Sequence, residues 1–286
     1  MRTVLITGAS SGVGLASAVA AAQAGLTAVA AIRRPGSDVA LREAAEKAGV
    51  PVDVAHLDVT DPTSVDDCLR SVVDRYGRLD AVVNNAGVSS SGTLELGTMA
   101  ALRADMEVNF FGVVAVSRAA MPHLRATKGR LIIISSVRGV IGQPFNEGYS
   151  AAKFAVEGLM EALAPVAAEV GVTVSLIEPA AVLDTEFINN STFDPAAALA
   201  AAGPYTEAFL GYRSWVESGS IEGAQTAAEV AAVVVDALTD PRPAFRIQTS
   251  EYARQYVTRK LADPDGSRIQ ELTRSWLRGS AIVHSG

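Results

Sequence analysis

The sequence has little that would support disulfide cross-links, a metal centre or a membrane anchor. Cys68 is the only cysteine among 286 residues, so the chain cannot form an internal disulfide. The three histidines, His56, His123 and His284, are too scattered to suggest a zinc set, and we expect no metal. No apolar run approaches a membrane span, and the N-terminus enters a strand-like segment without a signal sequence. We therefore expect a cytoplasmic protein with no membrane span.

Positive charge is also scarce. The net charge is -7 and the lysines and arginines are dispersed, which disfavours a nucleic-acid partner. Hydrophobic residues make up 49% of the chain, enough to bury a large core. One α/β domain with an insertion and a C-terminal extension can reach this length without a second core, so we expect a single domain over residues 1–286 and a small-molecule partner.

Short β-branched segments alternate with alanine-rich helical segments. The predicted strands cover residues 3–7, 27–32, 52–57, 79–83, 130–135, 172–177 and 244–248. The predicted helices cover residues 15–24, 39–48, 64–76, 99–124, 150–170 and 224–238, and two more begin at Ser250 and Gly266. This rhythm predicts a doubly wound α/β fold with a parallel sheet of about seven strands, a Rossmann fold. The cofactor half covers residues 1–135, and the C-terminal helical extension covers residues 249–286.

The alternation breaks over residues 183–223, where large aromatic residues gather. These are Phe187, Phe193, Tyr205, Phe209, Tyr212 and Trp215. Since the last three are spaced three apart, one face of a helix through them would be apolar. The pattern fits an amphipathic core helix and a lid over the substrate equally well. We place this insertion over the substrate as a helical lid.

A glycine-rich loop joins the first predicted strand to the first helix. Its residues are Thr7-Gly8-Ala9-Ser10-Ser11-Gly12-Val13-Gly14. Glycine lets the backbone turn sharply and approach a pyrophosphate, while the helix N-terminus attracts the anion. The alternative is an ordinary tight turn, but the place between first strand and helix favours a dinucleotide site. The expected contacts are Gly8, Ser10, Ser11, Gly12, Val13 and Gly14.

The end of the second predicted strand indicates which nicotinamide the site prefers. An NAD site has an acidic residue there, whereas this chain has Arg33 and Arg34 after Ile32. A guanidinium suits the 2′-phosphate of NADP, and the Ser11 hydroxyl is placed to help. The alternative is that both arginines are only solvated. We expect NADP(H).

Several motifs in order resemble the classical short-chain dehydrogenase/reductase family. They are the glycine loop, Asn84-Asn85-Ala86-Gly87, Ser136 and Tyr149-Ser150-Ala151-Ala152-Lys153. The likeness covers about residues 3–248. Pro144-Phe145-Asn146 and the segments 153–159 and 261–267 are most similar to the branch of 17β-hydroxysteroid dehydrogenase type 1 and the retinol dehydrogenases.

The chemistry of the Tyr149 and Lys153 pair can be argued without the family. Residues four apart share a helix face, so Lys153 can place its ammonium near the Tyr149 hydroxyl or near whatever Tyr149 contacts. Lowering a phenol pKa from about 10 toward about 7 requires roughly 4 kcal/mol of phenolate stabilisation. A cation in a poorly hydrated cleft, with cofactor charge, supplies that order of energy. Tyr149 is therefore the expected proton donor.

The resemblance implies roles for the remaining site residues. Tyr149 would protonate the carbonyl oxygen, Ser136 would hydrogen-bond it, and Lys153 would also hold the nicotinamide ribose. Asn109 would hold a water beside the lysine. Further implied cofactor contacts are Asp58, Val59, Asn85, Ala86, Gly87, Pro179, Val182 and Thr185. The family also implies a homodimer or homotetramer.

Each of these residues has a purely structural alternative. Tyr-x-x-x-Lys pairs are common on exposed helices, Ser135 and Ser136 can satisfy backbone groups at a strand end, and Asn109 can be a buried residue bonding a carbonyl. A cofactor-binding sensor with little turnover is the alternative function. Because sensors often lose the tyrosine or lysine, we expect an enzyme that interconverts a ketone or aldehyde and an alcohol.

Three residues depart from the family pattern. Ala180 replaces a glycine, so a positive φ there would be strained and the loop would take another path. Arg138 either points into the substrate pocket or lies on the surface. Gln143 stands where the branch has an apolar residue. The aromatic insertion predicts a hydrophobic substrate, such as a steroid, retinoid or polyketide-like carbonyl, but Arg138 and Gln143 disfavour a fully apolar steroid.

Overall fold

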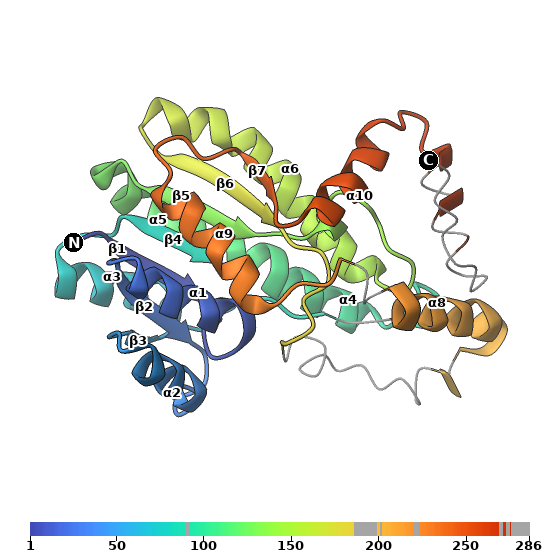
Figure 1. Cartoon of the computed structure of the whole chain (residues 1–286), viewed down its shortest axis with the longest axis horizontal. Coiled ribbons are helices and arrows are strands. Elements are labelled where there is room, and N and C mark those ends of the chain that lie inside the picture. The colour runs from blue at the N-terminus through green and yellow to red at the C-terminus, as the bar shows by residue number, and fades with distance from the viewer. Residues whose placement is uncertain are drawn as a thin grey trace.

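The computed structural model describes residues 1–89, 92–185, 199–200, 202–219, 223–268, 271–272 and 275, with the side chains of 217–219 left out. Seven parallel strands form one sheet in the order β3-β2-β1-β4-β5-β6-β7 (Figure 1). Their bounds are β1 Thr3–Thr7, β2 Thr27–Ile32, β3 Asp53–His56, β4 Ala81–Asn84, β5 Arg130–Ile134, β6 Thr173–Glu178 and β7 Arg246–Gln248. The predicted doubly wound fold is confirmed.

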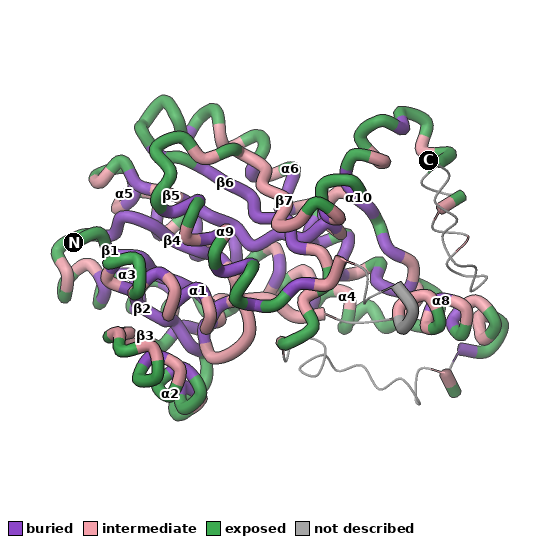
Figure 2. Tube along the Cα trace, in the orientation of Figure 1, coloured by how far each residue is buried: buried purple, intermediate pink, exposed green. Residues whose placement is uncertain are grey.

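Helices cover both faces of the sheet. One face packs against α3 (Pro62–Tyr76), α5 (Gly112–Thr127) and α6 (Glu147–Glu169), and the other against α1 (Gly12–Gln23), α2 (Val39–Ala48) and α9 (Ala227–Thr239). Alternate strand residues serve the two sides: Leu5 lies in one core, while Val4 and Ile6 lie in the other. The central strands are therefore buried along their length (Figure 2).

The strand order reverses beside β1. The chain runs from β1 outward to β3, returns to β4 on the other side of β1, and continues outward to β7. Because all seven strands are parallel, the loops after β1, β4, β5 and β6 open at the same edge. Ligands of such sheets bind outside the carboxyl ends of the strands at this reversal. This edge carries the predicted site residues.

The helix expected over residues 99–124 is interrupted. It consists of α4 (Met99–Met106), a π-helical segment η1 (Glu107–Phe111) and α5. The Asp105 carbonyl would accept the Asn109 backbone amide in a regular helix. Here it accepts the Asn109 side-chain amide at 3.0 Å, within a turn that holds an extra residue. The expectation of one continuous α-helix is therefore wrong at this turn.

Like α4, two helices late in the chain lie outside the two main cores. These are α8 (Thr206–Gly219), which follows a 3-10 turn η3 (Gly203–Tyr205), and α10 (Glu251–Leu261) (Figure 1). The expected apolar face of α8 forms a separate cluster in which Phe209 and Tyr212 pack around Phe145. Phe187, Phe193 and most of the chain after Gly266 lie outside the described residues. No helix within the described ranges is long and apolar enough to cross a membrane.

Phe145 has an unusual backbone. Its φ is +58°, in the left-handed region that bulky residues rarely adopt. Its ring centre lies 5.3 Å from that of Phe209 and 5.4 Å from that of Tyr212. Such strain persists only where surrounding contacts hold it. The aromatic face of α8 supplies those contacts immediately before α6 begins.

Candidate active site

The loop after β1 is tied to the segment after β4. The Thr7 hydroxyl accepts the backbone N–H groups of Asn85 and Ala86, both at 2.9 Å. The Asn85 side-chain amide donates to the carbonyls of Thr7 (2.9 Å) and Gly8 (3.1 Å). A Cβ on Gly8, whose φ is +65°, would lie 2.8 Å from the Cα of Ala86. The close approach of the two loops therefore requires glycine at position 8.

The N-terminus of α1 is open to an anion. Its cap residue Ser11 makes no side-chain bond to the first turn, so the hydroxyl and the leading N–H groups are available. Gly12 has a φ of +55°, and a Cβ on Gly14 would lie 2.5 Å from the Gly8 carbonyl. Ser10 and Val13 are half-buried beside them. This glycine cradle fits a pyrophosphate.

The ends of β2 and β3 bring Arg33 and Asp58 together. The side chains of Arg33 and Arg34 are exposed and make no hydrogen bond or ion pair with the rest of the described chain. Asp58 accepts the Thr60 backbone N–H at 2.9 Å and the Thr60 hydroxyl at 2.7 Å. Burial raises the pKa of Asp58, but these bonds and the charges of Arg33 and His56 outweigh it, so the pKa lies below its ordinary value.

Ser136 and Tyr149 meet at the end of β5. Tyr149 lies in the first turn of α6 and is 6% exposed, and Ser136 forms a hydrogen bond with its hydroxyl. Ser136 also accepts the Arg138 backbone N–H at 3.1 Å. Ser135 instead donates to the Glu157 carboxylate. The structure thus places Ser136, and not Ser135, beside the tyrosine.

Lys153 lies one turn after Tyr149 and is 4% exposed. Its ammonium is 5.6 Å from the centre of the Tyr149 ring and donates to the Ile134 carbonyl at 2.9 Å. Burial lowers the pKa of Lys153 to about 8, although the nearby Glu157 carboxylate opposes this. The expected shared helix face of the pair is present.

The pKa of Tyr149 moves against expectation. Burial has the largest influence and raises the pKa of the phenol. The largest opposing influence is the charge of Arg138, followed by the hydrogen bond from Ser136, while Asp105 raises the pKa further. The chain by itself therefore keeps Tyr149 protonated, and the charge that most favours its ionised form is that of Arg138.

A conserved-domain model described as short chain dehydrogenase matches residues 2–195, which hold the glycine loop, Ser136, Tyr149 and Lys153. The chain belongs to the short chain dehydrogenase family. It is therefore an oxidoreductase of alcohol or carbonyl groups that uses a nicotinamide cofactor. This family relationship covers both the loop and the tyrosine end of the site.

Relatives of this short chain dehydrogenase match most of its length. It is 36% identical to retinol dehydrogenase 8 of Bos taurus, over 93% of this chain and 87% of that protein. It is also 36% identical to 17-beta-hydroxysteroid dehydrogenase type 1 of Homo sapiens, over 92% of this chain and 82% of that protein. A short-chain dehydrogenase structure from Streptomyces avermitilis matches with a TM-score of 0.76 and 30% identity, covering 98% of both chains. The expected family and branch are confirmed.

Asn109 of this dehydrogenase is fully buried in the π-helical segment. Its side-chain oxygen accepts the Val88 N–H at 3.1 Å, and its amide donates to the Val88 carbonyl at 2.9 Å. These bonds fix the segment directly after Asn85, Ala86 and Gly87. The Asn109 side chain is thus a buried group that bonds a carbonyl, as the purely structural alternative describes. Its role in holding a water beside Lys153 stays a prediction. Val59 lies against the start of α5, where a Cβ on Gly112 would be 2.7 Å from it.

The loop after β6 is held at two points. The Pro179 carbonyl accepts the Val137 N–H at 3.0 Å, and Val182 forms a parallel bridge with Gln225. Ala180 is not among the described residues with positive φ, so the strain considered there is absent. The path leads Thr185 over the phosphate loop, because a Cβ on Gly12 would lie 3.2 Å from the Thr185 side chain.

Arg138 and Gln143 both lie at the active site. The half-buried Arg138 guanidinium donates to the Asn146 side-chain oxygen at 2.9 Å, and its carbon lies 5.7 Å from the Tyr149 ring centre. Gln143 donates to the Tyr212 hydroxyl at 2.7 Å, and Asn146 donates to the same hydroxyl at 3.1 Å. Sequence analysis missed Asn146 and Tyr212 as polar members of the site, although the polar residues before Tyr149 were a signal.

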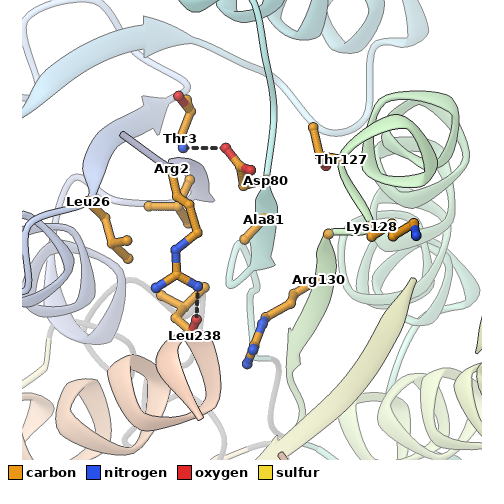
Figure 3. A pocket seen from close by; sticks show the side chains of 11 residues that line it. Arg2, Thr3, Leu26, Asp80, Ala81, Thr127, Lys128, Arg130 and Leu238 are labelled. Carbon is orange, nitrogen blue, oxygen red and sulfur yellow. Dashed lines mark hydrogen bonds between the residues drawn. The ribbon is translucent and has the colours of Figure 1, made fainter. Parts of the chain in front are cut away.

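The hollow in Figure 3 lies at the opposite edge of the sheet from Tyr149, beside residues that precede β1, β4 and β5. Arg2 donates to the Leu238 carbonyl at 3.1 Å, and Arg130 donates to the neighbouring Ala237 carbonyl. Both carbonyls belong to the last turn of α9, where the helix dipole favours cations. Asp80 accepts the Thr3 N–H at 2.7 Å. The hollow therefore has a structural explanation.

Proposed function

We propose that this short chain dehydrogenase is an NADP(H)-dependent enzyme that interconverts a ketone or aldehyde and an alcohol on a largely hydrophobic substrate. The observation that carries the proposal is the meeting of Ser136, Tyr149 and Lys153 at the edge of the sheet where the open α1 N-terminus also lies. The proton donor and the anion-binding end of α1 therefore lie on the same side of the molecule. The family assignment supports the same arrangement.

The chain's own residues supply the proton and hold the reacting oxygen. NADPH, when bound, supplies the hydride to the carbonyl carbon. Tyr149 donates its phenolic proton to the carbonyl oxygen, and Ser136 hydrogen-bonds that oxygen. The phenolate that remains is stabilised by the charges of Arg138 and Lys153 and by the Ser136 hydroxyl. Oxidation of the alcohol runs through the same residues in reverse.

The preference for NADP(H) over NAD(H) rests on Arg33. Its exposed guanidinium has no hydrogen-bond or ion-pair partner in the described chain, and Ser11 has a hydroxyl that makes no cap bond. A 2′-phosphate would accept bonds from both groups. No carboxylate follows β2 directly to bind a free ribose hydroxyl.

Apolar surface near α8 supports a hydrophobic substrate. Gly92 bridges to Asn146, and the Tyr205 hydroxyl bonds Glu95, so the segment after β4 that contains them lies beside the starts of α6 and α8. The exposed apolar residues of these segments are Leu94, Leu96, Met99, Leu183 and Leu210. Two similar proteins are named for retinol and for a hydroxysteroid. A substrate with a bulky apolar body fits these observations.

The test is NADPH and NADH oxidation with a panel of ketones, aldehydes, steroids and retinoids. We expect turnover with NADPH that falls about 10²- to 10⁴-fold in Tyr149→Phe. In Arg33→Ala the preference for NADPH over NADH should fall about 10- to 100-fold. In Arg242→Ala, at the opposite edge of the sheet, it should stay unchanged. If NADPH binds and no panel member reacts, a cofactor-binding sensor is favoured. If neither nicotinamide binds, the proposal is wrong.

A further inference from the structure

Arg138 brings a positive charge to Tyr149 that no ion pair within the described residues balances. Its guanidinium makes one hydrogen bond, to the Asn146 side chain, and lies over the Tyr149 ring. It forms no ion pair with any residue of the described chain. A guanidinium has five N–H donors, so most of them remain unused here. Leaving a half-buried cation without an anion is costly unless a ligand completes the site.

A second donor lies beside Arg138. The Tyr212 hydroxyl accepts hydrogen bonds from both Gln143 and Asn146, which leaves its own proton for donation. Arg138 and Tyr212 are bonded to opposite ends of the same Asn146 amide. The charge of Arg138 also acts on the Tyr212 hydroxyl. The two side chains therefore present N–H and O–H donors from one small patch.

The acidic residues of this region are already engaged elsewhere. Glu147 accepts the Thr93 hydroxyl at 3.0 Å, and the Asp105 carboxylate lies beside Gly148 and has a partner of its own. Neither carboxylate lies within ion-pair distance of Arg138. The patch consequently offers donors and positive charge without an acceptor to match.

We propose that Arg138, with the Tyr212 hydroxyl, binds a carboxylate of the substrate close to the carbonyl that Tyr149 protonates. The inference deepens the proposed function, on which it rests. Planar guanidinium groups bind carboxylates through two parallel bonds. Because the guanidinium carbon is 5.7 Å from the Tyr149 ring centre, the carboxylate is separated from the reacting carbonyl by only a few bonds. The substrate is then an oxo acid or hydroxy acid with an apolar body.

The test compares matched acids and esters. Initial rates with NADPH are measured for 2-oxo-4-phenylbutanoate, 4-oxo-4-phenylbutanoate and the ethyl ester of each. The enzymes are the native chain, Arg138→Gln, Arg138→Lys and the control Arg242→Gln, which removes an exposed arginine at the opposite edge of the sheet. Calorimetry with 4-phenylbutanoate and 4-phenylbutanamide, in the presence of NADPH, gives a readout independent of turnover.

We expect the native enzyme to prefer at least one acid over its ester in kcat/KM. Arg138→Gln should lower that acid-to-ester ratio about 10- to 100-fold, chiefly through the KM of the acid, since a charge-assisted bond is lost. Arg138→Lys should keep part of the ratio and Arg242→Gln all of it. The dissociation constant of 4-phenylbutanoate should rise in Arg138→Gln, and that of the amide should not.

Three results would overturn the inference. One is an acid-to-ester ratio that Arg138→Gln leaves unchanged. Another is equal binding of 4-phenylbutanoate and the amide by the native enzyme. The third is an equal slowing of acid and ester with a shifted pH profile, which would mean that Arg138 serves the Tyr149 hydroxyl. If the proposed function itself is wrong, Tyr149→Phe should reduce these ketones at the native rate, while carboxylate binding still depends on Arg138. The two kinds of failure therefore give different results.

Discussion

At the scale of single residues, the charge of Lys153 changes a little above neutral pH. Its ammonium is buried beside Tyr149, where burial lowers the pKa to about 8. A lysine is charged below its pKa, so the ammonium is present at neutral pH and is lost as the pH rises through about 8. Tyr149 keeps its proton in the same range because burial raises the pKa of the phenol.

The pH dependence of carbonyl reduction follows from this difference. We expect kcat/KM for NADPH to fall as the pH rises above about 8, because the Lys153 charge disappears while the proton donor remains. Lys153→Arg keeps its charge, so its profile should lack this fall even if its absolute activity is lower. Profiles that decline alike in both enzymes would assign the fall to another group.

Two glycines make a matched pair for testing the phosphate loop. Gly14→Ala places a methyl group against the Gly8 carbonyl and the Asn85 side chain, so we expect loss of stability of about 1–3 kcal/mol and at least tenfold weaker NADPH binding. Gly158 lies exposed within α6 with open space at its Cβ position. Gly158→Ala should stabilise the helix by about 0.5–1 kcal/mol. Urea unfolding measures the stability of both variants, and cofactor titration measures their NADPH binding. Equal effects of Gly14→Ala and Gly158→Ala would contradict the loop geometry.

At the scale of elements, the Tyr212 hydroxyl joins α8 to Gln143 and Asn146 beside the active site. Tyr212→Phe removes the acceptor of the Gln143 and Asn146 amides, which should cost about 1–3 kcal/mol because buried donors lose their partner. We expect a KM for the carbonyl substrate raised about tenfold and an unchanged dissociation constant for NADPH. Tyr205→Phe removes a hydroxyl that bonds Glu95 at the surface; this variant is the control and should change KM little.

Most elements of the fold follow local patterns that the sequence displays. The β1, β2 and α2 bounds match the predicted ranges because each is a short run with clear turn residues at its ends. The π-helical turn at Asn109 escaped prediction because it depends on bonds to Val88, far along the chain. The sequence pointed to Ala180 as a residue that a positive φ would strain, and φ there is not positive, whereas Phe145, which packs against α8, has a positive φ that no local pattern indicated.

The candidate site was predictable to a similar degree. The spacing of Tyr149 and Lys153 fixes their shared face, and the place of Ser136 in the sequence selects it over Ser135. The direction of the Tyr149 pKa was not predictable, because it depends on burial and on Arg138, whose orientation no local pattern determines. The role of Asn85 in holding the Thr7 and Gly8 carbonyls likewise requires the two loops to be side by side.

At the scale of the whole molecule, η1 and α6 leave large apolar side chains exposed. Phe111 is 51% exposed at the end of η1, directly before α5, and Phe154 and Val166 are exposed on α6. We propose that the surface carrying these side chains pairs with a second copy in a homodimer or homotetramer. Phe154→Glu should then give a monomer in light scattering, whereas Val39→Glu on α2 should not. A native monomer would contradict the proposal.

The left-handed backbone of Phe145 couples α8, which packs on this residue, to the chain before Tyr149. This coupling restricts which segments can be exchanged between related enzymes. That conformation costs about 1–3 kcal/mol and is offset by the Phe209 and Tyr212 rings. A chimera that receives a different helix in place of α8 would lose the Phe209 and Tyr212 rings and keep the strained Phe145. Transferring substrate preference between such enzymes therefore requires that residue 145 and this helix be exchanged together.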